Sequence, residues 1–230
     1  MKSFKIYPIL WIVLFCLGFP SEVSGQYIRK ETVGGKTYAV IYADGLAGAA
    51  QWGTGIKMMR NGTTIRHQVS KGNSGNLAVN DRIPFRFIVA TEDVGNNDRN
   101  WMTMQGVNDG GNNENSDFAT TANTGCRWYG ATGSPGAGRK WRVPTQRELQ
   151  LMWMFREPIG LVYKDKPMEE PGKTKRYWSS TEKGTDQAWF FEFAPGMPYC
   201  DTQAKSMANG MVRCVSWNLQ INLLLNNMKQ

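Results

Sequence analysis

The chain has 230 residues, of which 41% are hydrophobic and 20% are charged. This composition supplies enough apolar side chains for a folded core and argues against an intrinsically disordered chain. The net charge is +8, but the basic residues are scattered along the chain. Because nucleic-acid binding needs clustered positive charge, we predict no nucleic-acid partner.

The N-terminal segment, residues 1–25, predicts a secretory signal peptide. Lys2 and Lys5 precede an apolar run over Ile6–Phe19, and small residues ending at Gly25 form a cleavage pattern. The run is shorter than the roughly 20 residues that cross a bilayer, so a retained anchor is the weaker alternative. We expect a secreted, periplasmic or cell-surface protein with no membrane segment after cleavage. Its mature chain would carry 25 basic and 18 acidic residues, a net charge of +7.

The first part of the mature chain, residues 26–82, predicts a small β-rich region. Two runs rich in β-branched and aromatic residues flank Gly34 and Gly35, which predicts a hairpin. Residues 83–90 alternate well enough to predict a further strand. Residues 92–125 are mostly polar and predict a long loop with a short helix near Trp101.

The strongest local signal lies between residues 141 and 155. Thr145 and Glu148 have the spacing of a capping box, which predicts a helix that begins after Thr145. Apolar residues cover so much of this helix that it must be largely buried. Pro158 and Gly160 are expected to end it. We therefore assign Glu148 to helix capping and not to catalysis.

Three short segments near the C-terminus predict strands of an antiparallel sheet. They are aromatic or β-branched, are separated by turn residues, and cover residues 177–181, 188–193 and 211–217. The tail, residues 218–230, suits either a strand or a final helical turn. These elements together predict an α+β fold.

Four separated blocks resemble a family of bacterial C-type-lectin-like domains with W-R-L-P-T, Y-W-S-S-T and V-R-C-V motifs. The motif residues here are Trp141, Arg142, Pro144, Thr145, Glu148, Leu149, Tyr177, Trp178, Ser179, Ser180, Thr181, Val212, Arg213, Cys214 and Val215. The aromatic block at 188–193 lies between the second and third motifs. The resemblance implies a C-type-lectin-like domain over residues 83–217, with an antiparallel sheet, one or two helices and long loops.

The chain is also similar to secreted Bacteroidales proteins, including fimbrial tip subunits. In these, an A-T-E-D strand end precedes the domain, here residues 90–93, and a cysteine precedes the W-R-L-P-T motif, here Cys126. One departure is Ser216 and Trp217, where such domains continue with Arg-Asp.

Removal of the signal peptide would leave three of the four cysteines, so at least one thiol must stay outside any intramolecular disulfide. The resemblance implies that Cys214 pairs with Cys126. Pairing of Cys200 with Cys214 is the alternative.

The sequence offers no complete catalytic or metal-binding motif. The single histidine, His67, has no neighbouring Asp or Ser that would form a triad, and no zinc-ligand spacing or phosphate-binding loop occurs. Asn and Asp residues around 108–117 offer oxygen ligands of the type that calcium prefers. The motifs by which C-type lectins hold calcium and sugar are missing, however. We expect no cofactor, with calcium as the weaker alternative.

The resemblance and the lack of a catalytic set predict an exported, non-catalytic binding or adhesion protein, at the cell surface or in a fimbria-like assembly. Its expected ligand is a glycan or a protein. Lectin-like folds bind through long loops, which points to residues 96–117 and 164–176. The predicted ligand-binding residues are Trp101, Asn108, Asp109, Asn113 and Asp117.

Two alternatives stay open. One is an enzyme that resembles the formylglycine-generating oxidases, in which Cys200 would form a reactive pair with Cys214 or Cys126. The other is a structural subunit whose sheet edge pairs with a neighbour in a surface assembly.

Overall fold

The computed structural model describes residues 26–43, 51–52, 83–84, 86–105, 125–182, 187–194 and 196–217. The helices and strands in these residues form an α+β fold with a four-stranded, a five-stranded and a two-stranded sheet. Among the described helices, none is long and apolar enough to cross a membrane.

The first sheet joins the N-terminal hairpin to the rest of the fold. Its strands, in spatial order, are β1 (Tyr27–Val33), β2 (Lys36–Tyr42), β5 (Arg86–Val89) and β11 (Val215–Trp217), and every pair is antiparallel. Gly34 and Gly35 have φ of 60° and 78°, the left-handed values of a tight hairpin turn. The predicted hairpin is therefore confirmed. Because β2 pairs with β5, the boundary expected between residues 82 and 83 does not separate two sheets.

The second sheet holds the strands predicted from the aromatic segments. Its order is β6 (Val94–Arg99), β10 (Gly210–Val212), β7 (Lys175–Glu182), β8 (Gln187–Phe193) and β9 (Tyr199–Ala204). The pairs are antiparallel except for β10 and β7, which run parallel. The edge strands β6 and β9 were not predicted, because their sequences are polar. A small parallel pair joins β3 (Gln51–Trp52) and β4 (Ile83–Pro84).

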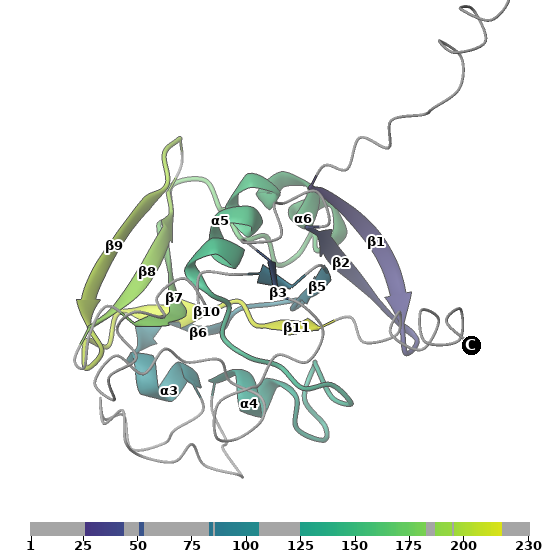
Figure 1. The fold of residues 1–230 in the computed structure, drawn as a ribbon, viewed down its shortest axis with the longest axis horizontal. Helices are drawn as coiled ribbons and strands as arrows, with labels where there is room; N and C mark the ends of the chain where they lie inside the picture. The colour runs from purple at the N-terminus through teal and green to yellow at the C-terminus, as the bar shows by residue number, and fades with distance from the viewer. Residues whose placement is uncertain are drawn as a thin grey trace, which may run out of the picture.

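The single strand predicted over residues 211–217 is wrong. The structure divides it into β10 and β11, which belong to different sheets. Arg213 and Cys214 lie between the two strands, and both are fully buried. The chain also crosses between the sheets from β5 to β6, and in Figure 1 both crossings lie at the centre of the molecule. The strand is interrupted at this junction, where the buried Arg213 side chain bonds to Asp93 and to the carbonyls of Ala90 and Lys166.

The predicted helix start is confirmed and the predicted end is wrong. The α5 helix (Gln146–Met154) begins after Thr145, and both hydrogen bonds of the capping box are present. It stops at Phe155, and a second helix, α6 (Arg156–Val162), follows. Pro158 lies in the first turn of α6, where its missing N–H costs no internal hydrogen bond. Pro158 and Gly160 are thus part of α6 and do not end α5.

Two hydrophobic cores lie on opposite faces of β2. Tyr38 and Val40 contribute to one core, and Ala39 and Ile41 to the other, as the two-residue period of a strand requires. The first core includes residues of α3 (Trp101–Gln105) and α4 (Gly125–Tyr129), and the second includes residues of α5 and α6. Figure 1 accordingly shows the two helix pairs on opposite sides of the strands. This burial on both faces explains why β2 is a continuous apolar run.

Candidate functional site

The first motif block forms a buried ion pair at the start of α5. Arg142 donates to both carboxylate oxygens of Glu148, at 2.7 and 2.5 Å. The same carboxylate accepts the backbone N–H of Thr145 at 2.8 Å. The side chains of Arg142 and Glu148 are 1% and 0% exposed, so no ligand can reach them. The geometry agrees with the assignment of Glu148 to capping.

The remaining motif residues also lie in the interior. The indole N–H of Trp141 donates to the carbonyl of Gly136 at 2.8 Å, and that of Trp178 donates to the carbonyl of Arg99 at 3.0 Å. Tyr177 is fully buried as well, and this burial raises the pKa of its hydroxyl well above the usual range. These residues therefore support the fold.

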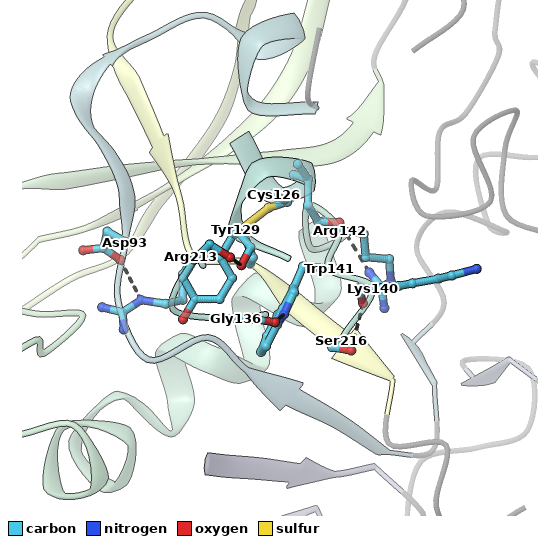
Figure 2. Close-up of a disulfide and its surroundings, with 12 residues drawn as sticks. Asp93, Cys126, Tyr129, Gly136, Lys140, Trp141, Arg142, Arg213 and Ser216 are labelled. Carbon is cyan, nitrogen blue, oxygen red and sulfur yellow. Dashed lines mark hydrogen bonds and ion pairs between the residues drawn. A yellow bond between two sulfur atoms is a disulfide. The ribbon is translucent and has the colours of Figure 1, made fainter. Parts of the chain in front are cut away.

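A second buried pair joins the two sheets. Arg213 lies in the crossing from β10 to β11, and its Nε lies 2.6 Å from Oδ1 of Asp93, in the crossing from β5 to β6. Figure 2 shows Arg213 pointing toward Asp93. Arg213 also donates to the carbonyls of Ala90 and Lys166, at 3.2 and 2.9 Å. Arg213 is completely buried, whereas the side chain of Asp93 is 14% exposed. Asp93 thus pairs with a buried guanidinium while part of its own side chain is exposed.

The disulfide implied by the resemblance is confirmed. Cys126, in α4, is bonded to Cys214 at the sheet junction (Figure 2). The alternative pairing of Cys200 with Cys214 is therefore wrong, and Cys200 forms no disulfide. The oxidase alternative needed Cys200 beside a second reactive thiol, and both of its expected partners are bonded to each other.

The predicted ligand-binding residues have different outcomes. Trp101 is fully buried, and its indole N–H donates to the carbonyl of Ser179 at 2.7 Å. The structure corrects its predicted role: it places this ring in the core and not on a surface that a ligand could contact. The other four lie outside the described residues: Asn108, Asp109, Asn113 and Asp117. Within the described part of the chain, no group of three or more Asp, Glu, His or Cys side chains could hold a metal ion.

A cleft of about 360 Å³ opens between the two segments predicted to bind a ligand. We call it the polar cleft. Residues 96 and 97 line one side of it, and residues of the 164–176 segment line the other. Its ligand-accessible polar side chains include Glu92, Asn96, Lys166, Glu170 and Lys173. The sequence indicated both segments but gave no sign that they meet.

Lys175 holds the wall of the polar cleft together. Its ammonium group lies 3.1 Å from Asp93 Oδ2 and 2.7 Å from Glu170 Oε1, and it donates to the carbonyl of Pro167 at 2.6 Å. The ammonium group of Lys175 thus bridges the two carboxylates. Lys173 contacts the other oxygen of Glu170 at 2.6 Å. Hydrogen bonds from Lys173 and Lys175 lower the pKa of Glu170 to about 2, so this carboxylate stays ionised even in mildly acidic solution.

A bulge in edge strand β6 forms the other wall. Val94 and Arg99 pair with Val212 and Gly210 of β10, so four residues of β6 lie opposite one residue of its partner. Asn97 has a φ of 62° in this bulge. Its side-chain amide donates to the carbonyl of Thr174 at 2.9 Å, and its side-chain oxygen accepts the N–H of Arg176 at 2.9 Å. These bonds fix the spacing of the cleft and leave Asn96 exposed beside it. Bulges often position functional side chains in this way.

The arrangement suits recognition of a polar ligand. Carboxylates accept hydrogen bonds, lysines donate them, and the amide of Asn96 can do both. The three carboxylates and three lysines that line the cleft balance in charge. A ligand with many hydroxyl groups can satisfy such a mixed set of donors and acceptors.

Comparisons with known proteins give a family and no individual relative. No curated protein and no solved structure matches the chain. The model of the Lcl C-terminal domain matches residues 95–216, more than half of the 230 residues. The match begins in the β6 bulge and ends in β11, so it includes the polar cleft except for Glu92 and Asp93. The chain therefore belongs to the lectin-like family of the Lcl C-terminal domain.

Proposed function

We propose that this protein is an exported, non-catalytic binding protein that recognises a glycan in the polar cleft. The observation that carries the proposal is the cleft itself, where exposed donors and acceptors are held by buried, well-bonded neighbours. Lys175 and Asn97 fix the two walls through bonds that a ligand need not break. Preorganised polar groups of this kind lower the entropic cost of binding.

A glycan suits the cleft better than a protein surface does. The cleft is concave and lined by charged and amide side chains, and Met211 is its single large apolar contributor. Protein interfaces rely on buried aromatic and apolar anchors at their centre. Sugars instead offer hydroxyl groups that pair with carboxylates, amides and ammonium groups at short range.

We place the protein in the periplasm, at the cell surface or in a fimbria-like assembly. The signal-peptide pattern of residues 1–25 supports export, and the Cys126–Cys214 disulfide fits an oxidising compartment. N-terminal sequencing of protein recovered from the producing cells tests this directly. A mature chain that begins at Gln26 supports export. An uncleaved chain that still begins at Met1 and is found in the cytoplasmic fraction contradicts export.

A glycan array, run with calcium and again with a chelator, tests the binding function. We expect binding that weakens by about fivefold or more in Asn96→Ala and Lys173→Ala, because each loses a charged or amide hydrogen bond to the ligand. Lys140→Ala is the matched control, since Lys140 is also exposed but does not line the cleft. Equal affinity in all three variants would place the ligand elsewhere. Binding to no glycan, with protein ligands captured instead, would overturn the glycan assignment.

A further inference from the structure

A second hollow adjoins the polar cleft and shares part of its wall. It has a volume of about 670 Å³ and lies among β6, α3 and α4. Gly95 and Asn96 line both spaces, so the β6 bulge is the partition between them. We call this space the Trp128 hollow, after the aromatic side chain at its α4 side.

Trp128 is exposed, and its neighbours in α4 anchor the backbone that carries it. Its side chain is 40% exposed, whereas Trp101, Trp141 and Trp178 are buried. On one side of it in α4, Cys126 is bonded to Cys214. On the other side, Tyr129 is fully buried and its hydroxyl bonds to the backbone N–H of Thr91 at 3.0 Å. The backbone that carries Trp128 is therefore fixed from both sides.

The backbone at the first residue of α4 is also constrained. Gly125 has a φ of 62°, and a Cβ at this position would lie 2.4 Å from the carbonyl oxygen of Met104. Only glycine allows α4 to approach α3 so closely. Because the backbone under the exposed indole is fixed, little backbone freedom is lost when a ligand binds to the ring.

Hydrogen-bonding groups surround the indole. Asp98, Arg99, Asn100 and Thr103 also line the hollow. Asp98 and Arg99 form an ion pair at 3.5 Å, with both side chains about half exposed, so their charges balance. A flat apolar ring beside neutralised polar groups suits one face of a sugar ring, with its hydroxyl groups directed to the sides.

On the basis of the proposed function, we infer that the ligand is an uncharged oligosaccharide chain that crosses the β6 bulge. One sugar unit occupies the polar cleft, and a following unit stacks on Trp128. The shared wall at Gly95 and Asn96 makes the two spaces neighbouring positions for consecutive units. The balanced charge of both spaces favours a neutral chain over a polyanion.

Calorimetric titration with neutral tetrasaccharides and their monosaccharides tests this inference. The probes are cellotetraose, xylotetraose, mannotetraose and N-acetylchitotetraose, with heparin as the polyanionic comparison. We expect at least one tetrasaccharide to bind tenfold or more tightly than its monosaccharide. Trp128→Ala should weaken the binding of the tetrasaccharide by about tenfold, and Trp128→Phe should restore part of the lost affinity. The affinity for the monosaccharide should not change in either variant.

The control is Leu161→Ala, because Leu161 is an exposed apolar side chain that does not line the hollow. Circular dichroism of each variant verifies folding. A tetrasaccharide that binds equally well to Trp128→Ala, but less well to Lys173→Ala, overturns this inference and leaves the proposed function intact. Binding to heparin alone, with an affinity that falls steeply with salt, contradicts the inference that the ligand is uncharged. Binding to none of these probes overturns both.

Discussion

The buried arginine pairs and the lysines of the polar cleft use the same kind of bond in different environments. Arg142 and Glu148 are 1% and 0% exposed, whereas Lys173 and Glu170 are 69% and 30% exposed. A buried charge that loses its partner stays without water, while an exposed charge is solvated at once. The first kind of pair therefore holds the fold, and the second can exchange its partner for a ligand at little cost.

This difference predicts the largest effect on stability at Glu148. Glu148→Ala leaves the guanidinium of Arg142 buried without its carboxylate and also removes the capping-box bond that the Thr145 backbone N–H donates to this carboxylate. We expect the free energy of unfolding to fall by about 3–5 kcal/mol, or the variant not to fold at all. Urea unfolding followed by circular dichroism measures this.

The matched control is Glu157→Ala. Glu157 contacts Arg156 at 3.8 Å, and its side chain is 82% exposed. Its loss should change stability by less than about 0.5 kcal/mol. Similar losses for the two variants would contradict the distinction between buried and exposed pairs.

The disulfide provides the next largest effect and a different test of the junction. Replacing both Cys126 and Cys214 by Ser releases a link between residues 88 apart in the sequence. We expect a loss of about 2–5 kcal/mol, because the unfolded chain gains freedom. Cys200→Ser, which breaks no disulfide, is the control and should cost less than about 1 kcal/mol. If the double variant and the control unfold at the same urea concentration, the disulfide does not stabilise the junction.

A smaller, pH-dependent effect is expected at Glu170. Its pKa is lowered to about 2 in the folded protein by hydrogen bonds from Lys173 and Lys175, against about 4.3 for an unfolded Glu. The stabilisation is therefore complete above the unfolded pKa and disappears as the pH falls toward 2. Because the side chain is 30% exposed, solvent screening reduces the contribution to about 1 kcal/mol.

The comparison of Glu170→Gln with the unaltered protein measures this contribution. The difference in unfolding free energy should be present at pH 7 and should shrink as the pH is lowered from 4 to 2. High salt should also reduce it. A difference that is the same at every pH would show that Glu170 acts through packing and not through its charge.

Apart from the disulfide, which the family resemblance implied, the features predicted correctly from sequence were those that a pattern of a few neighbouring residues specifies. The capping box spans Thr145 to Glu148, and the hairpin turn depends on Gly34 and Gly35, so local patterns were sufficient. The strands β6 and β9 were missed because polar edge strands lack the apolar alternation that identifies a buried strand.

The polar cleft depends on contacts that no local pattern encodes. Asp93 and Lys175 are 82 residues apart, and Asn97 and Thr174 are 77 apart. No local pattern encodes the division of residues 211–217 either, since Arg213 at that point bonds to Asp93, which lies 120 residues away in the sequence. The sequence could thus indicate which segments bind a ligand, while only the fold brings their side chains together.

The smallest effect on stability is expected at Lys173, and it separates binding from folding most clearly. Lys173 contacts one carboxylate and is mostly exposed, while the neighbouring Lys175 contacts Asp93, Glu170 and a backbone carbonyl and is 10% exposed. Lys173→Ala should lower the free energy of unfolding by no more than about 0.5 kcal/mol, although it removes an ammonium group from the cleft. Lys175→Ala should cost about 2 kcal/mol, because Asp93 and Glu170 lose a largely buried donor. Thermal unfolding of the two variants measures this contrast. Equal losses would mean that both lysines hold the fold, which would leave the polar cleft without an ammonium group that is available to a ligand at low cost.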